Sequence, residues 1–251
     1  MTFSLIRSAL FLPGSNLRAI EKARSLDADA IIFDLEDAVA DHMKISAREQ
    51  VRTEVERGGY DGKKLIVRVN SLGTSWIDDD IEAISSVADA ILLPKVECAS
   101  DIREVRSRIP RKVTSGPSIW AMIETAKGIL KVREIAEEAA AERLSALVVG
   151  PNDIERTTHT TPGEERRNFL PWLLEILVSG RSYDLLVLDG VFSRLDDEEG
   201  FLAECRQGHE LGFDGKTLIH PKQIAGANQA FTDREADRVG AQSRRRLRNS
   251  S

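Results

Sequence analysis

The stretch Ser118-Ile119-Trp120-Ala121-Met122-Ile123-Glu124 decides the fold of this 251-residue chain. Its residues are apolar almost throughout and end in one carboxylate, as expected for a parallel strand that is covered on both faces. A short turn and a helical run that begins at Ile129 follow directly. Glu124 is therefore predicted to lie where a strand meets a helix, which is where α/β proteins place their chemistry. The alternative interpretation is a capping carboxylate near the start of a helix.

The same pattern of an apolar run, a polar end and a helical segment recurs along the whole chain. The other predicted strands are residues 9–12, 30–35, 64–70, 90–93, 146–150, 184–189 and 216–219. The predicted helices are residues 20–25, 45–56, 76–85, 100–108, 129–141, 169–177, 198–211 and 221–231. Residues 154–163 show little periodicity and are predicted to form a long loop.

Eight strand–helix units predict an α/β fold of the (β/α)8 TIM-barrel type, with one catalytic domain over residues 1–231. A doubly wound open sheet is less favoured, because no Gly-x-Gly-x-x-Gly motif follows the first strand. The basic residues 232–251 are expected to form a short helical tail in solvent.

Composition narrows the class of protein. The net charge of -6 argues against a nucleic-acid partner, and the 41% hydrophobic content argues against disorder. No apolar run has the length of a membrane span, and the first residues lack the order of a signal peptide, so we expect no membrane partner and a cytoplasmic location. The two cysteines, Cys98 and Cys205, are too few for a disulfide framework or a four-thiolate metal site.

Polar residues follow the predicted strands, and the carboxyl ends of barrel strands meet at one rim. These residues are Glu36, Asp37, Arg68, Asn70, Lys95, Glu124, Asn152, Asp153, Asp189 and His220. The ring is mainly acidic, and neighbouring carboxylates stay ionised together only when a cation lies among them. Oxygen ligands without a pair of histidines indicate Mg²⁺, or else Mn²⁺. Glu124 and Asp153, from consecutive strands, are the predicted direct ligands.

The other rim residues are given roles around this ion. Glu36 and Asp37 are predicted to hold its waters. Arg68 offers a planar fork for a carboxylate or an enolate oxygen, with an ion pair to one of the acids as the alternative. Lys95 either meets a phosphate or pairs with Glu97. A metal beside an arginine suits reactions in which negative charge develops on carbon and spreads to oxygen.

Several motifs resemble those of a known family. They are Leu10-Phe11-Leu12-Pro13-Gly14, Asp34-Leu35-Glu36-Asp37-Ala38-Val39, Arg68-Val69-Asn70, Leu93-Pro94-Lys95-Val96-Glu97, Ile123-Glu124-Thr125-Ala126-Lys127-Gly128, Gly212-Phe213-Asp214-Gly215-Lys216 and Ile219-His220-Pro221. In this order they resemble the citrate lyase β-subunit (CitE-like) family of the HpcH/HpaI aldolase and citrate lyase superfamily. The resemblance implies a barrel, commonly a homotrimer, that uses Mg²⁺ to cleave or form a carbon–carbon bond. Its substrates would be 3-hydroxyacyl thioesters such as citryl-, malyl- or citramalyl-CoA.

The resemblance also implies residue roles. Glu124 and Asp153 would bind the metal, and Arg68 and Glu124 would contact the substrate, with Pro151 and Asn152 beside them. A retro-Claisen step would remove the proton of the C3 hydroxyl and release a thioester enolate. The implied partners are an acyl-CoA or acyl-carrier thioester, a small keto acid and further copies of the chain.

The chain departs from its relatives in two places. Nothing after Phe231 matches the C-terminal lid of malyl- and citryl-CoA lyases, whose last acid reaches a neighbouring subunit's site. The acid–base group would then be Glu36 or a water on the metal. The segment Gly150-Pro151-Asn152-Asp153 is closer to the Gly-Pro-x-Asp version of the pyruvate aldolase branch. The alternatives are therefore a class II aldolase acting on free 4-hydroxy-2-oxo acids, or a catalytically weak barrel that serves as a subunit or binding module.

Overall fold

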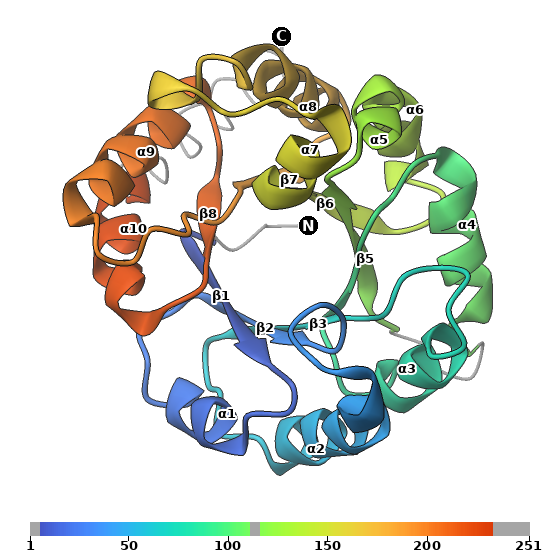
Figure 1. Cartoon of the computed structure of the whole chain (residues 1–251). Helices are drawn as coiled ribbons and strands as arrows, with labels where there is room; N and C mark the ends of the chain where they lie inside the picture. The colour runs from blue at the N-terminus through green and yellow to red at the C-terminus, as the bar shows by residue number, and fades with distance from the viewer. Residues whose placement is uncertain (1–5, 111–115, 233–251) are drawn as a thin grey trace, which may run out of the picture.

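Eight parallel strands form a closed ring in the computed structural model, which describes residues 6–110 and 116–232 (Figure 1). The strands are β1 (Ser8–Pro13), β2 (Ala30–Asp34), β3 (Lys64–Arg68), β4 (Ala90–Leu93), β5 (Ser118–Ile123), β6 (Leu144–Val149), β7 (Leu186–Asp189) and β8 (Gly215–Leu218). Each strand pairs with the next one in the chain, and β8 pairs with β1. The predicted (β/α)8 barrel is confirmed. The predicted basic tail, from residue 233 onward, lies outside the described residues.

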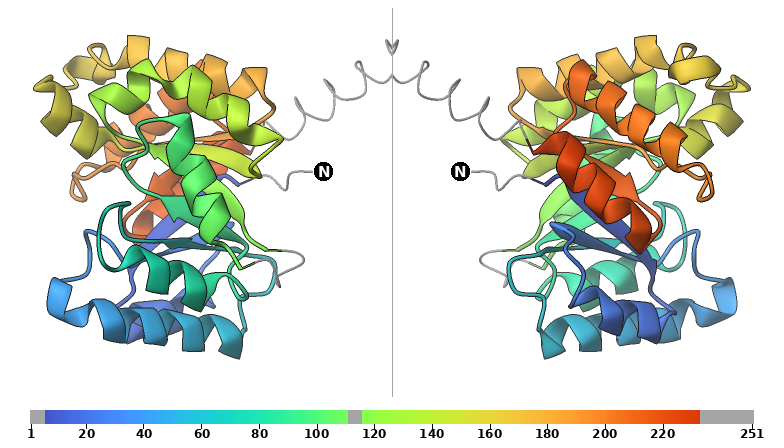
Figure 2. Two further views of the ribbon diagram at one scale, coloured as in Figure 1. Left: turned by 90° about the vertical axis from the view of Figure 1, so that its right-hand side faces the viewer. Right: turned by 90° about the vertical axis from the view of Figure 1, so that its left-hand side faces the viewer.

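Helices surround the ring, except that α7 lies over one mouth of it, beside β6 and β7 (Figures 1 and 2). They are α1 (Leu17–Ala23), α2 (Lys44–Arg57), α3 (Ile77–Ile84), α4 (Ala99–Arg108), α5 (Ala126–Leu130), α6 (Val132–Ala136), α7 (Pro151–Thr158), α8 (Leu170–Ser182), α9 (Glu198–Leu211) and α10 (Ile224–Phe231). Short 3-10 turns are η1 (Asp41–Met43), η2 (Glu137–Ala139), η3 (Glu164–Arg166) and η4 (Pro221–Gln223). The single helix predicted for residues 129–141 is divided into α5, α6 and η2. None of the helices in the described ranges combines the length and the apolar character needed to cross a lipid bilayer.

The long loop predicted for residues 154–163 is wrong in its first half, because residues 151–158 form α7. Pro151 occupies the first turn of this helix, a position that proline favours. Ile154 is its one buried residue, so the sequence carries no apolar stripe from which a helix could be predicted. The left-handed residue His159 ends it. This helix places Asn152 and Asp153 at the carboxyl end of β6.

Alternation along the strands divides the buried residues into two layers. One cluster fills the inside of the barrel and includes Ile32, Ile66, Trp120, Met122 and Val148. The larger cluster lies between the strands and the helices. Because side chains two residues apart share a face, the residue two positions beyond each inward side chain also points toward the barrel axis. This rule determines which strand-end residues reach the mouth of the barrel.

Candidate active site

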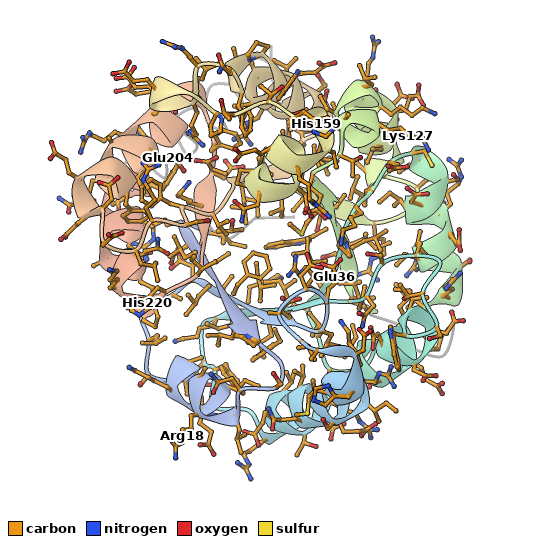
Figure 3. The ribbon with its side chains drawn as sticks, viewed as in Figure 1. Arg18, Glu36, Lys127, His159, Glu204 and His220 are labelled. Atoms are coloured by element: carbon orange, nitrogen blue, oxygen red, sulfur yellow. The ribbon has the colours of Figure 1, made fainter. Side chains whose placement is uncertain are left out.

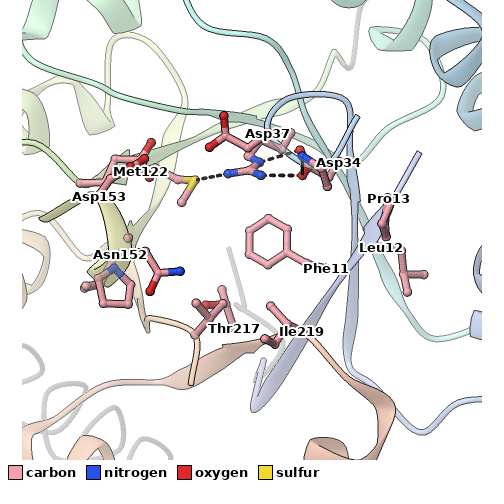
Figure 4. Close-up of a pocket in the computed structure, with 17 residues that line it drawn as sticks. Phe11, Leu12, Pro13, Asp34, Asp37, Met122, Asn152, Asp153, Thr217 and Ile219 are labelled. Atoms are coloured by element: carbon pink, nitrogen blue, oxygen red, sulfur yellow. Dashed lines mark hydrogen bonds and ion pairs between the residues drawn. The ribbon is translucent and has the colours of Figure 1, made fainter. Parts of the chain in front are cut away.

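The strand ends bring polar side chains together around a cavity of about 410 Å³ at one mouth of the barrel (Figure 4). Asp34, Arg68 and Glu124 each lie two residues beyond an inward-facing apolar side chain, and all three line this cavity. The predicted site residues that line it are Asp37, Arg68, Glu124, Pro151, Asn152 and Asp153. Apolar side chains such as Phe11, Met122 and Ile219 supply much of the remaining wall.

Glu124 is a buried carboxylate whose pKa is raised above its ordinary value. Its side chain follows β5, and Oε1 accepts a hydrogen bond of 2.7 Å from the backbone N–H of Lys95. Burial, first of all, and then the charge of Asp153 raise the pKa of Glu124, which lies at about 7. The Lys95 hydrogen bond and the charge of Arg68 lower the pKa but do not cancel this effect. A buried acid that repels a neighbouring acid is the kind of group that a cation would return to its ionised form.

Asp153 is the second acid of this pair and belongs to the first turn of α7. Its Oδ1 accepts a hydrogen bond of 2.9 Å from Arg156 Nε, and it lines the same cavity as Glu124. Across the described part of the chain, no group of three or more His, Cys, Asp or Glu side chains is arranged to hold a metal. A cation here would therefore be held by these two carboxylates, with its other positions open. Mg²⁺ suits such a site, because it commonly takes one or two carboxylates and keeps several waters.

Arg68 is held in place by Asp34, an acid to which the sequence analysis gave no role. Arg68 Nε and Nη2 donate to the two carboxylate oxygens of Asp34 at 2.7 and 2.5 Å (Figure 4). The charge of this bidentate partner keeps the pKa of Arg68 above its usual value although burial opposes this. The alternative interpretation of Arg68 as ion-paired with a rim acid is confirmed by its contact with Glu36 at 3.1 Å, whereas the pair with Asp34 was not predicted. The pairing register of β2 and β3 could have predicted this ion pair, because Asp34 and Arg68 lie directly opposite each other.

Nη1 of Arg68 faces the site. It lies 3.1 Å from Glu36 Oε2 and 3.9 Å from Met122 Sδ, and the guanidinium lies 5.1 Å from the centre of the Phe11 ring. Only about a tenth of the Arg68 side chain is exposed, so this N–H group is fixed in direction and shielded from water. An oxygen that gains charge in the cavity would meet a donor that is already oriented.

Glu36 and Asp37 are placed differently from each other. Glu36 accepts from Ser71 Oγ at 3.1 Å and pairs with Lys95 and Arg68, and it is not among the cavity-lining residues. It lies near the barrel centre, whereas His220 lies on the outer ring (Figure 3). Asp37 lines the cavity with a largely exposed side chain.

Lys95 does not pair with Glu97, so that alternative is wrong. Its ammonium group contacts Glu36 and lies 3.5 Å from Asp37 Oδ1, while Glu97 pairs with Lys127 at 2.9 Å. Lys127, in the first turn of α5, pairs with Glu97 in place of Lys95. The ammonium group of Lys95 therefore lies at the barrel mouth. Both partners of the Lys95 ammonium group come from the segment after β2.

Besides Glu36 and Lys95, three further predicted rim residues do not line the cavity. Asp189 follows inward-facing Leu188 and therefore points outward, where it is buried between Arg166 at 2.7 Å and Lys216 at 3.0 Å. Asn70 donates to the buried Asp80, and His220 accepts from the backbone N–H of Lys222 as a cap of η4. The capping contact gives His220 a structural role.

Gly150 fixes the other side of the Glu124 carboxylate. A Cβ atom at this position would lie 2.5 Å from both Cβ and Oε2 of Glu124. We expect Gly150→Ala to lower activity by about 10- to 100-fold and to destabilise the fold by about 1–3 kcal/mol, because the acid must move or its strand must shift. Gly226→Ala in α10 is the control for activity, since its Cβ would also be crowded, by Leu202 Cδ2 at 2.8 Å and Phe201 Cε1 at 3.0 Å, but away from the cavity lining. Steady-state kinetics and urea unfolding measure both effects; unchanged activity in Gly150→Ala would contradict this account of Glu124.

The sequence of this chain is similar to a known family and to characterised proteins. The family model of the HpcH/HpaI aldolase/citrate lyase family matches residues 7–221. The (3S)-malyl-CoA thioesterase of Cereibacter sphaeroides (strain KD131 / KCTC 12085) is 45% identical over 92% of this chain and 79% of its own length. Citrate lyase subunit beta of Escherichia coli (strain K12) is 35% identical, again over 92% of this chain and 79% of its own length.

Solved structures agree with the sequence relatives. The protein CitE from Mycobacterium tuberculosis, in complex with magnesium, acetoacetate and coenzyme A, is 30% identical with a TM-score of 0.75. The match covers 94% of this chain and 86% of that chain. The same protein in complex with magnesium and pyruvate is 29% identical, covers 89% of both chains and gives a TM-score of 0.74.

Proposed function

This chain belongs to the HpcH/HpaI aldolase/citrate lyase family, and from that membership we propose that it is a Mg²⁺-dependent carbon–carbon lyase. Its substrate would be a short 3-hydroxyacyl-CoA thioester such as malyl-, citryl- or citramalyl-CoA. The observation that carries the proposal is the convergence of Glu124 and Asp153 on one cavity, beside the oriented guanidinium of Arg68. The relatives named above act on or bind CoA thioesters, keto acids and magnesium according to their names.

Glu124 and Asp153 would hold the ion. When bound, Mg²⁺ supplies a positive charge that orients and polarises the oxygens of the substrate. Pro151 and Asn152, which line the same wall at the start of α7, would contact the keto-acid portion. Besides Asp34, which is paired with Arg68, three acids line the cavity: Asp37, Glu124 and Asp153. They make an ion important for binding an anionic substrate, because they would otherwise repel it.

In the cleavage direction, the C3 hydroxyl loses its proton and the C2–C3 bond breaks. The electron pair of that bond moves to the thioester as an enolate, and a proton added at C2 completes the acyl-CoA product. Arg68 Nη1 would donate to the enolate oxygen while Asp34 keeps the guanidinium plane fixed. Asp37 is better placed than Glu36 to exchange the proton, because Glu36 is tied to Arg68 and Lys95.

Thioester hydrolysis is a second candidate reaction. The observation that favours it is the 45% identity to a (3S)-malyl-CoA thioesterase. In hydrolysis a water would attack the thioester carbonyl and the CoA thiol would leave, and Arg68 would again face the oxygen that gains charge. The same site therefore serves both reactions, which differ in the bond that breaks.

Some finer features of the proposal rest on the sequence. We infer a cytoplasmic location from the composition, and a homo-oligomer, a trimer or a multiple of three, from the family resemblance. We expect Mn²⁺ to support activity in place of Mg²⁺, because both ions accept oxygen ligands in octahedral geometry. Sedimentation equilibrium tests the assembly: a mass equal to that of one chain would contradict the oligomer.

A substrate panel with and without chelator tests the proposed function. Malyl-, citramalyl- and citryl-CoA and free 4-hydroxy-2-oxo acids are assayed with Mg²⁺ and again with EDTA. We expect at least one thioester to be cleaved to a keto acid and a shorter acyl-CoA, with loss of nearly all turnover in EDTA and recovery on adding Mg²⁺. Free CoA without a keto acid would favour the hydrolase. Turnover confined to CoA-free substrates would favour the aldolase, and equal turnover in EDTA would contradict the metal-dependent mechanism.

A further inference from the structure

Lys95 combines two features that the proposed mechanism does not use. Its backbone is left-handed, with φ of 52°, a conformation that residues other than glycine rarely adopt. Its N–H group donates the hydrogen bond to Glu124 Oε1 at 2.7 Å. Within residues 6–110 and 116–232, this is the one hydrogen bond made to the Glu124 carboxylate. Strained residues of this kind persist where the surrounding structure holds them, and they gather at functional sites.

The chain on both sides of Lys95 requires this turn. Strand β4 ends at Leu93, and the N–H of Val96 already donates to Met122 O on β5 at 3.3 Å. Leu93 lies opposite Ala121, and Val96 already contacts the next residue of β5, so Pro94 and Lys95 form a two-residue excursion beside β5. The left-handed conformation of Lys95 lies in this excursion, and its amide is directed at Glu124.

The side chain explains why a lysine is present where glycine would avoid strain. Its ammonium group contacts Glu36 and lies 3.5 Å from Asp37, so the residue is held at its far end by two carboxylates. Glu36 is itself fixed by Arg68 at 3.1 Å and by Ser71. These contacts offset the cost of the backbone and tie it to the same network that orients Arg68.

The hydrogen bond from Lys95 determines which oxygen of Glu124 remains available to a ligand. With Oε1 occupied by the Lys95 amide and Gly150 packed against the side chain, the carboxylate has one orientation. Oε2 is left without a hydrogen bond from any described residue. It lies beside Gly150, the residue before α7, and Asp153 belongs to the first turn of that helix.

We propose that Lys95 is a positioning residue, whose left-handed backbone amide holds Glu124 in the orientation that binds the divalent cation. The inference rests on the proposed function, since the cation is the one assigned to Glu124 and Asp153. Lys95 is not among the residues that line the cavity, so in this proposal it would contact neither the ion nor the substrate. Removing the conformation should therefore weaken Mg²⁺ binding more than removing the side chain does.

Three variants of Lys95 distinguish the contribution of its backbone conformation from that of its side chain. Lys95→Gly adopts the left-handed conformation freely and keeps the N–H. Lys95→Met keeps the N–H and the strain but loses the ammonium anchor, and Lys95→Val adds a β-branch that disfavours the conformation. Arg143→Val is the matched control, because Arg143 has φ of 57° just before β6, at the opposite end of the barrel.

Isothermal calorimetry with Mg²⁺ alone gives the readout. We expect Lys95→Gly to keep the Kd within about threefold of wild type, Lys95→Met to be intermediate, and Lys95→Val to weaken binding at least about tenfold. Arg143→Val should lose thermal stability like Lys95→Val but keep its Mg²⁺ affinity. Lys95→Val that binds as tightly as wild type, or Lys95→Gly that binds as weakly as Lys95→Val, overturns the inference alone. A wild-type protein that binds no Mg²⁺ overturns the proposed function as well.

Hydrogen exchange provides a measurement without metal. The amide of Lys95 should exchange at least about tenfold faster in Glu124→Ala than in wild type, because its acceptor is gone. The neighbouring amide of Val96 donates to Met122 O and should be unchanged. Equal exchange of the Lys95 amide in both proteins would overturn the role given to this hydrogen bond.

Discussion

Glu124→Gln is expected to lower kcat/KM for the cleaved thioester by about a thousandfold or more, because it removes one of the two ligand charges of the cation. The side chain keeps its size, and its carbonyl oxygen still accepts from the Lys95 amide. The loss should therefore reflect chemistry and not misfolding. Glu97→Gln is the matched control, since Glu97 follows β4 on the same rim but pairs with Lys127. A Glu124→Gln enzyme within tenfold of wild type would contradict the metal site.

The same substitution should stabilise the metal-free protein above neutral pH. The folded-state pKa of Glu124, about 7, exceeds its ordinary value of 4.5. The folded protein thus binds more protons than the unfolded chain between these values, and its free energy of unfolding falls as pH rises through this window. The effect is at most about 3 kcal/mol above pH 7. Thermal unfolding in EDTA should show Glu124→Gln more stable than wild type at about pH 8 and the difference vanishing toward about pH 4.5. A variant less stable than wild type at the higher pH would contradict the destabilised carboxylate.

Arg68→Met is expected to lose both activity and stability. Activity should fall by about a thousandfold, because the oriented donor to the developing oxyanion is removed. Stability should fall by about 3–5 kcal/mol, because the buried Asp34 keeps its charge without its bidentate partner. Asp34 retains the backbone N–H groups of Glu36 at 2.9 Å and Ala38 at 3.1 Å, which keep the variant foldable. Urea unfolding and steady-state kinetics measure the two losses.

A double variant separates the two effects. Asp34→Asn combined with Arg68→Met removes the orphaned charge, and we expect it to regain much of the lost stability but none of the lost activity. Recovery of activity in the double variant would mean that Arg68 acts only by neutralising Asp34. Loss of stability without loss of activity in Arg68→Met would lead to the same conclusion.

The fold was predictable because each strand is short, apolar and ended by a polar residue. Residues 118–123 and 90–93 were placed to the residue, since their apolar runs have sharp boundaries. Helix α7 was missed because one buried side chain, Ile154, leaves no periodic stripe. Periodicity detects packing against a core, and a short helix over the barrel mouth packs little.

The site was predictable only in part. Sequence order gives the rim residues but not the face on which each lies, so Asp189 was counted with Glu124 although it points outward. Lys95 illustrates a second limit. Its side-chain partners and its left-handed backbone depend on how the chain leaves β4 beside β5, and no local sequence pattern indicates this.

The ring closes between the first and the last strand, where Ser8 pairs with Lys216. During synthesis, β1 emerges from the ribosome long before β8, the strand that pairs with its second edge. The roughly 200 residues between them take on the order of 10–40 s to be translated. The nascent chain therefore exposes an open parallel edge for most of its synthesis. We expect ribosome-bound chains that stop before β8 to be bound by chaperones and to aggregate when released.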